Sequence, residues 1–471
     1  MNYKNKNLIP IFLILGFLFF SQPAYAETIT KTLYAWARDL AGNISLSLND
    51  TVEITTEKFT KTFATRIGGT SLSEGDEIIL AKNDVIILNR FAYQDINGDT
   101  YASIKNINPD AKIFLYQMGS EVSYLHDSYN LISLNTLGRW NVSRGHSMGS
   151  VNGNNSNFIL LDSTGNYIYN TAFPGTYLMD VGLNSYQQYW IEATNNDISN
   201  QPWVADGVFM DGCPSTLQLN SYNSNPVKYN NNNSLWVSAI NSFINSVSGG
   251  LSGQNQLTGA NSGNTRFQEG YDSLVLLDSV TNPPYFVLEE GAFAVEWGPN
   301  AVQFYGQVEW KRQVDLLKEI DNFRLLYLSH TKLSPGQSGL DNYQKTVNFY
   351  DVLWYSLASF HLGKKSNSFF EFSNGSYNNL NWYDEYTEID LGNPISNYQI
   401  VDINGVAIFM REFEKGYVYV NSSNINVSNI TLPKTSRQLN HDNLFFEPSL
   451  LPQINSINLD SHRGTFLLKV F

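Results

Sequence analysis

The chain has 471 residues, of which 42% are hydrophobic and 15% are charged, so it can bury a large core and is neither disordered nor collagen-like. Its net charge of −14, with no block of Lys or Arg, excludes the basic surface that a nucleic acid would need. The single cysteine, Cys213, cannot close an intramolecular disulfide, and Cys and His do not recur at zinc-finger spacing. These features favour a globular protein with an uncharged partner over one with an anionic partner.

The first 26 residues have the pattern of a secretory signal. Lys4 and Lys6 precede an uncharged apolar run over residues 8–20, and Ala24-Tyr25-Ala26 supplies the small residues of a cleavage site. The run is too short to span a membrane, and no later segment is as apolar. The sequence therefore predicts cleavage after Ala26 and a secreted or periplasmic mature protein that has no membrane partner. An uncleaved N-terminal anchor is the alternative.

From about residue 84, short apolar runs alternate with longer amphipathic stretches, which is the pattern of a parallel sheet with crossover helices. The predicted strands cover residues 84–89, 112–117, 176–180, 207–211, 274–277, 285–289, 323–329 and 368–372. The predicted helices cover residues 185–193, 234–247, 302–320 and 343–362. Eight such strands predict an α/β fold, a (β/α)8 TIM barrel, over residues 76–385. A doubly wound open sheet is the alternative, but the Gly-rich turn of many such folds does not follow the first strand.

Residues 386–471 lack the helical pattern and are predicted to form an all-β, sandwich-like module. Two candidate strands, residues 398–403 and 406–413, flank Asn404-Gly405, the dipeptide typical of a two-residue hairpin turn. Further strands are predicted at residues 417–420, 430–432 and 466–470. Residues 27–75, before the predicted barrel, form a separate segment with a strand and loop pattern.

Acidic residues follow several predicted strands, at the end of a barrel where active sites are built. Asp180 and Asp211 end the third and fourth strands, and Glu289 and Glu290 end the sixth. Because a buried, unpaired carboxylate is costly, such a cluster at one end of a barrel indicates a site. Side chains alternate along a strand, so only one of Glu289 and Glu290 can point to the barrel axis.

A pair of carboxylates is what cleavage of a glycosidic bond requires, one to protonate the leaving oxygen and one to attack the sugar or activate water. We predict Asp211 and Glu290 as catalytic residues, with Asp211 ionised and Glu290 as the acid; the reverse assignment fits almost as well. Asp180 and Glu289 are candidates for substrate binding. The alternative is structural: Asp211 caps a loop, and Glu290 forms a surface ion pair.

Aromatic residues near the predicted strands could stack on the apolar faces of sugars. The candidates are Tyr93, Tyr116, Trp140, Trp203 and Trp297, with ordinary packing as the alternative for each. The histidines show no metal-ligand spacing, so we expect no metal and no cofactor. The nucleophile elbow of a serine hydrolase, Gly-x-Ser-x-Gly, is absent from the sequence.

Several motifs, through their order and spacing, resemble those of one family. They are residues 108–116 (NPDAKIFLY), 178–180 (LMD) followed by Tyr186 and Trp190, 205–211 (ADGVFMD), 288–291 (LEEG), 388–394 (EIDLGNP), 411–413 (REF) and 416–421 (GYVYVN). Over most of residues 84–471 the chain is similar to hypothetical glycosyl hydrolase family 15, which implies a glycoside-hydrolase-like barrel. The run ending at Asp211 also resembles strand four of alpha-amylase-like enzymes, whose final Asp is the nucleophile. The Arg that lies two residues earlier in those enzymes is Phe209 here.

Together these observations predict a secreted, monomeric glycoside hydrolase that cleaves O-glycosidic bonds of a polysaccharide or oligosaccharide, neutral or built of amino sugars. The alternative is a non-catalytic carbohydrate-binding or surface-interaction protein on the same barrel. An esterase or deacetylase acting on polysaccharide substituents is a third hypothesis, less favoured because the nucleophile elbow and metal-ligand spacing are lacking.

Overall fold

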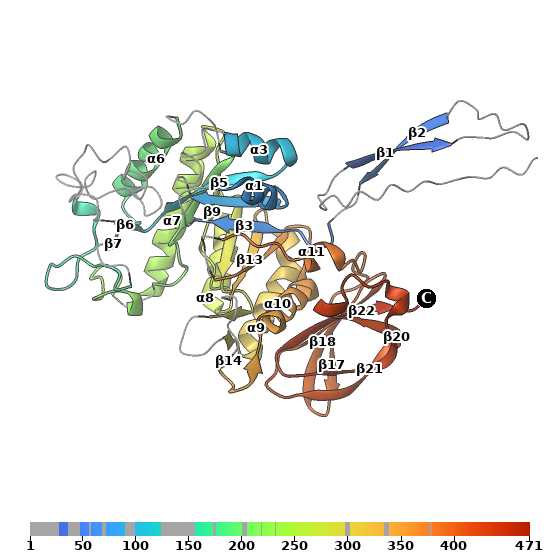
Figure 1. Cartoon of the computed structure of the whole chain (residues 1–471). Helices are drawn as coiled ribbons and strands as arrows, with labels where there is room; N and C mark the ends of the chain where they lie inside the picture. The colour runs from blue at the N-terminus through green and yellow to red at the C-terminus, as the bar shows by residue number, and fades with distance from the viewer. Residues whose placement is uncertain are drawn as a thin grey trace, which may run out of the picture. The chain divides into compact units, whose positions relative to one another are not determined.

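The computed structural model describes residues 28–35, 48–55, 58–67, 72–89, 99–123, 156–172, 176–199, 205–217, 219–230, 232–296, 302–333, 339–375, 377 and 379–471. The chain divides into two units, residues 1–58 and 59–471. In the first unit, β1 (Thr28–Ala35) and β2 (Leu48–Thr55) pair antiparallel along their whole length. The second unit holds a barrel and an all-β module (Figure 1).

Eight parallel strands follow one another around the barrel in chain order. They are β3 (Phe63–Arg66), β4 (Val85–Asn89), β5 (Lys112–Met118), β8 (Gly207–Asp211), β9 (Leu257–Ala260), β10 (Phe286–Glu290), β13 (Leu326–Lys332) and β16 (Ser368–Ser373). The ring closes between its first and last strands, where Phe370 N donates to Lys61 O at 3.0 Å and Thr62 pairs with Phe370. The prediction of a (β/α)8 barrel is confirmed.

Large apolar side chains fill the barrel interior, so the barrel is a packed core and not a channel. The ring centroid of Phe286 lies 4.8 Å from that of Phe114 and 5.7 Å from that of Phe209. The ring of Phe286 also explains why residue 259 of β9 is a glycine. A Cβ atom at this position would lie 2.1 Å from the ring. Only glycine fits at this point of the barrel wall.

Helices alternate with the barrel strands along the chain (Figure 1). They are α1 (Glu74–Ala81), α3 (Asp99–Ile107), α6 (Asn184–Ser199), α7 (Asn233–Ser252), α8 (Gln268–Ser279), α9 (Gln307–Glu319), α10 (Phe349–Gly363) and α11 (Glu385–Glu388). In α7, Trp236, Ile240, Phe243 and Val247 recur at helical spacing and are buried, while Asn232 caps the helix by accepting from Leu235 N. No helix among the described residues has both the length and the apolar character that crossing a membrane requires.

Short elements lie outside the barrel ring. Three antiparallel pairs are formed by β6 (Glu121–Ser123) with β7 (Thr176–Leu178), β11 (Ala294–Val295) with β12 (Gln303–Phe304), and β14 (Gly339–Leu340) with β15 (Thr346–Val347). The 3-10 helices are η2 (Ser156–Phe158), η3 (Leu219–Ser221), η4 (Ile320–Asn322), η5 (His441–Asn443) and η6 (Pro448–Leu450).

Two of the predicted strands are wrong. Residues 176–180 hold β7, which lies outside the barrel, and residues 274–277 lie inside α8, where Leu274 and Leu277 are buried at helical spacing. Their places in the ring are taken by β3 and β9, which are four residues long and lack a continuous apolar run. Because β3 belongs to the barrel sheet, the barrel begins within residues 27–75 and not at residue 76.

The module after α11 is one six-stranded antiparallel sheet in the order β17-β18-β19-β22-β20-β21. Its strands are β17 (Gln399–Ile403), β18 (Val406–Glu412), β19 (Gly416–Asn421), β20 (Val427–Leu439), β21 (Gln453–Leu459) and β22 (Arg463–Lys469). Asn404 and Gly405 join β17 to β18 with φ values of 55° and 82°, as the predicted hairpin turn requires. The strand β21 has no counterpart among the predicted strands.

The module packs against the barrel through α10, which contacts β18, β19 and β22 of the module as well as α9 and β16. Arg411 of β18 is buried and donates to the carbonyl oxygens of His361 and Lys364, each at 3.0 Å. These carbonyls belong to the end of α10, where a helix leaves its last acceptors without internal partners. One apolar cluster, separate from the barrel interior, extends from the helices around the barrel into the module.

Candidate active site

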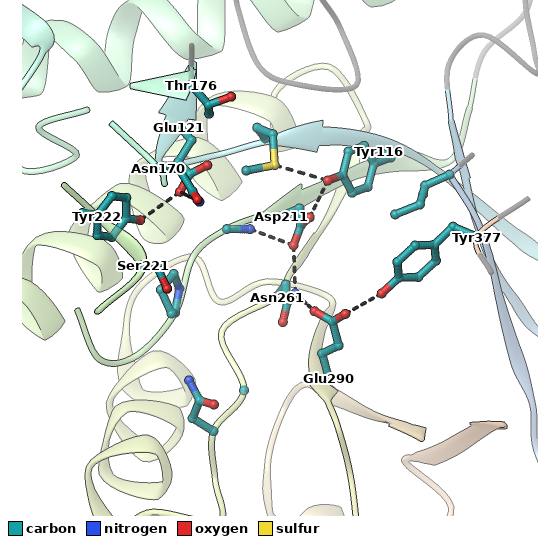
Figure 2. Close-up of a pocket in the computed structure, with 16 residues that line it drawn as sticks. Tyr116, Glu121, Asn170, Thr176, Asp211, Ser221, Tyr222, Asn261, Glu290 and Tyr377 are labelled. Atoms are coloured by element: carbon teal, nitrogen blue, oxygen red, sulfur yellow. Dashed lines mark hydrogen bonds between the residues drawn. The ribbon is translucent and has the colours of Figure 1, made fainter. Parts of the chain in front are cut away.

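Asp211 and Glu290 line the same pocket, of about 500 Å³, at the carboxyl end of the barrel strands (Figure 2). Asp211 is the last residue of β8, and Glu290 is the last residue of β10. The other described residues of this pocket are Ile67, Tyr116, Met118, Glu121, Asn170, Thr176, Gly212, Pro214, Ser221, Tyr222, Asn261, Gly263, Asn264 and Tyr377. Two strands that are far apart in the sequence therefore bring the two acids to one cavity.

Asn261 joins the two carboxylates. Its side-chain nitrogen donates to Asp211 Oδ1 at 2.8 Å and to Glu290 Oε2 at 3.1 Å (Figure 2). Because one nitrogen reaches both, these two oxygens lie no more than about 6 Å apart, within the range of paired glycosidase carboxylates. Asn261 follows β9 directly, and its backbone N–H donates to Met210 O at 2.8 Å, which fixes it beside β8.

Asp211 accepts three hydrogen bonds. Oδ1 accepts from Gly212 N at 2.7 Å and from Asn261, and Oδ2 accepts from the hydroxyl of Tyr116. Burial raises the pKa of Asp211, and repulsion from Glu290 adds to the rise, while the three hydrogen bonds oppose it. An amide N–H can only donate, so Oδ1, which contacts both amide groups, acts as an acceptor.

Glu290 also accepts a hydrogen bond from a tyrosine hydroxyl. The hydroxyl of Tyr377, which follows β16, donates to Glu290 Oε1. Burial raises the pKa of both Tyr377 and Tyr116 well above the ordinary value, and the neighbouring carboxylates raise it further. Both phenols therefore stay protonated and act as donors. The pair of acids thus lies in a cavity with fixed donors, and such a pair can give and take a proton at a single substrate atom.

Glu289 points away from the pocket, as the alternation along β10 requires. It is fully buried, and its Oε2 accepts from Asn264 N and Thr265 N at 2.7 Å each. Its Oε1 pairs with Arg266 Nη1 at 3.3 Å. This carboxylate stabilises the loop after β9, which carries Asn261. Its position outside the pocket does not fit the expected role in binding substrate.

Asp180, the other acid expected to bind substrate, also lies outside the residues of this pocket. Its carboxylate pairs with Lys228 Nζ at 2.7 Å and accepts from the hydroxyl of Tyr229 at 2.6 Å. The reason is the misassigned strand: Asp180 follows β7, which is not a barrel strand, so it does not reach the rim where Asp211 lies.

Of the aromatic candidates, Tyr116 lines the pocket and donates to Asp211. The other four lie outside the described residues: Tyr93, Trp140, Trp203 and Trp297.

Sequence reasoning did not identify Glu121, Asn170, Asn261 or Tyr377 as residues of the site. Glu121 had a usable signal, since it follows the apolar run of β5 by three residues. Asn261 had none, because the strand that it follows, β9, is short and contains a glycine. Asn170 and Tyr377 come from loops, where no periodicity marks a residue.

Among the described parts of the chain, no group of three or more His, Cys, Asp or Glu side chains is placed to hold a metal ion.

The chain is similar to one protein family and to several solved structures. The model of hypothetical glycosyl hydrolase family 15 matches residues 105–417, more than half of the chain. Similar solved structures include the glycoside hydrolase domain of PelA from Pseudomonas aeruginosa, with 12% identity and a TM-score of 0.40, covering 69% of this chain and 98% of that one. The maltogenic alpha-amylase AmyB from Thermotoga neapolitana has 9% identity and a TM-score of 0.41, covering 87% and 98%. The trehalulose synthase MutB has 8% identity and a TM-score of 0.47, covering 87% of this chain and 99% of that one.

No curated protein matches the chain. The chain belongs to hypothetical glycosyl hydrolase family 15, on the scaffold of a glycosidase.

Proposed function

We propose that this protein hydrolyses O-glycosidic bonds of a polysaccharide outside the cytoplasm, as a monomer, with Asp211 and Glu290 as its catalytic residues. The observation that supports this most strongly is the pair of carboxylates that share Asn261 in one pocket at the carboxyl end of the barrel. The secretory pattern of residues 1–26 supports action outside the cytoplasm.

In the proposed mechanism, Asp211 is the nucleophile. Its oxygen attacks the anomeric carbon while Glu290 gives its proton to the leaving glycosidic oxygen, so that the C–O bond breaks and a glycosyl ester forms. Glu290 then takes a proton from water, which attacks the same carbon and releases Asp211. The three donors on Asp211 favour it as the ionised partner, because they stabilise its negative charge.

The spacing of the two acids supports retention of anomeric configuration. Retaining enzymes have carboxyl groups about 5 Å apart, whereas inverting enzymes leave about 6.5 to 9.5 Å for a water molecule. Asn261 keeps one oxygen of each acid no more than about 6 Å apart, below the inverting range.

The test is hydrolysis of a glycan panel by purified residues 27–471, read as new reducing ends. Asp211→Asn and Glu290→Gln should each lower kcat by about 10³-fold or more, because each removes a group needed in the transition state. Asp272→Asn, a change on the exposed face of α8, should retain full rate. For an active substrate, proton NMR of the first product formed should show the anomer of the substrate.

Full activity in both carboxylate variants would refute the proposed catalytic residues. Tight glycan binding without hydrolysis of any panel member would favour a carbohydrate-binding protein instead.

A further inference from the structure

The pocket holds a third carboxylate that the proposed mechanism does not use. Glu121 of β6 lines the same cavity as the catalytic pair and is 6% exposed (Figure 2). Its Oε1 accepts from Asn170 Nδ2 at 3.1 Å and from the Tyr222 hydroxyl at 2.9 Å. Within the described structure, its Oε2 has no hydrogen-bond partner, so one oxygen of the carboxylate remains available to a ligand.

A second polar group beside Glu121 also lacks a partner. Thr176 of β7 is 3% exposed and lines the pocket, and its hydroxyl oxygen makes no hydrogen bond within the described structure. In the β6–β7 ladder, Glu121 is opposite Leu178, so Thr176 is its diagonal neighbour on the same face, about 7 to 8 Å away at Cα. A buried hydroxyl without a partner is costly, and a ligand atom between these two side chains would satisfy both.

The segment that carries Glu121 is fixed in place. Gly119 N donates to Asp211 O at 2.7 Å, which ties the segment to the strand of the nucleophile. From α6, the Tyr186 hydroxyl donates to Gly119 O at 2.7 Å, and Trp190 Nε1 donates to Met118 O at 3.1 Å. Glu121 is therefore held at a set position relative to Asp211, as a specificity residue must be.

The charge of the pocket indicates what the ligand atom is. Its described residues include three carboxylates, Asp211, Glu290 and Glu121, and no Lys, Arg or His. Burial raises the pKa of Glu121, and repulsion from Asp211 adds to this rise, so the free pocket holds more negative charge than it can easily stabilise. A cation supplied by the substrate would compensate that charge, whereas a neutral sugar would not.

We propose that Glu121 and Thr176 bind the ammonium group of a substrate sugar, so that the pocket selects glycans with free amino groups over their N-acetylated forms. An ammonium has three donors and no acceptor, which matches the free Oε2 of Glu121 and the free hydroxyl oxygen of Thr176. An acetamide in its place would bring a bulky neutral group to the carboxylate. This inference rests on the proposed glycoside hydrolase function and names its substrate class.

The test measures binding separately from hydrolysis. Asp211→Asn keeps the oxygen that accepts from Gly212 and Asn261, and it blocks turnover. In this background, calorimetry compares matched oligosaccharides of glucosamine and of galactosamine with their N-acetylated counterparts. At least one free-amine oligosaccharide should bind about tenfold or more tightly than its acetylated form, the size of one charge-assisted hydrogen bond.

Adding Glu121→Gln should bring the two affinities within about twofold of each other, because the amide keeps the volume and the acceptor for Asn170 and Tyr222 but loses the charge. Glu447→Gln, an exposed change in the module, serves as the control and should keep the tenfold preference. Circular dichroism and melting temperature establish that the variants are folded. If Glu121→Gln fails to fold, Thr176→Val in the same background should reduce the preference.

The outcomes separate the two proposals. Tighter binding of acetylated or neutral oligosaccharides, with hydrolysis of them by the unmodified enzyme, would overturn the amine preference and leave the glycosidase function standing. A preference for free amines that persists in Glu121→Gln would overturn the role of Glu121. Failure of every oligosaccharide to bind or be hydrolysed would overturn both proposals.

Discussion

At the scale of single residues, the amide of Asn261 holds two negative groups at a fixed separation. Without it, repulsion would drive the carboxylates of Asp211 and Glu290 apart, since no other described side chain donates to both. The separation matters because a nucleophile and an acid must reach adjacent atoms of the same bond.

Asn261→Ala should therefore lower kcat by about 10²-fold, comparable to the loss of one preorganised donor, with a smaller effect on KM. Steady-state kinetics on the best glycan of the panel would measure this change. Asn230→Ala, at an exposed position, is the matched control and should leave both constants as they are. Equal kcat in the two variants would contradict the role given to Asn261.

The titration of Asp211 provides a second prediction. Repulsion from Glu290 contributes to the raised pKa of Asp211, so Glu290→Gln should lower that pKa. Carbon NMR of the labelled carboxyl group would follow the titration in both proteins. Glu447→Gln should leave it unchanged, and an equal or higher pKa of Asp211 in Glu290→Gln would count against the coupling of the two acids.

At the scale of elements, β10 separates two carboxylates that are adjacent in the sequence. Glu290 faces the pocket, and Glu289 faces the loop that follows β9, where it accepts from backbone amides and pairs with Arg266. The strand thus directs one acid to the pocket and the other to the loop that carries Asn261.

Glu289→Gln should destabilise the fold by about 3 kcal/mol or more, because it leaves Arg266 without its buried partner and turns a donor toward backbone donors. Urea unfolding would measure the loss. Glu269→Gln, exposed on α8, should change the free energy of unfolding by less than about 0.5 kcal/mol. A loss of similar size in both variants would show that the buried network contributes little.

The sequence predicts those elements whose pattern is local. Strands such as β8 and β10 are continuous apolar runs that end in acids, so both they and the candidate pair could be read directly. The strand β9 could not, because its glycine is required by the ring of Phe286, a contact between segments distant in the chain. For the same reason Asn261 was missed. Asp180 shows the opposite error, since an apolar run ending in an acid is not by itself a barrel strand.

At the scale of the whole molecule, three buried histidines contribute to the response of stability to acid. Burial lowers the pKa of His330 and of His462 to about 3, and it lowers that of His361, at the end of α10, well below the ordinary 6.5. These rings stay neutral in the folded protein, while the unfolded chain binds protons below about pH 6.5.

Each such histidine should therefore lower stability by about 1.4 kcal/mol per pH unit as pH decreases from 6.5 toward 3. Burial raises the pKa of Glu371 to about 8, so this group adds stability as pH falls from 8 toward its ordinary range and offsets one histidine there. Denaturant unfolding at a series of pH values would measure the slope. His361→Leu should make this slope shallower, because it removes one of the buried rings. An equal slope in His361→Leu and in the unmodified protein would show that the His361 ring is protonated in the native state.

The contact between β3 and β16 bears on biosynthesis. Pairing of Thr62 with Phe370 closes the ring between β3 and β16. Most of the chain therefore has to leave the ribosome before β3 can pair with β16. The residue that then caps α10, Arg411, is translated later still. Until that point the edge of β3 and its apolar surroundings are open to other chains, so yield in a producing cell depends on protection during translation.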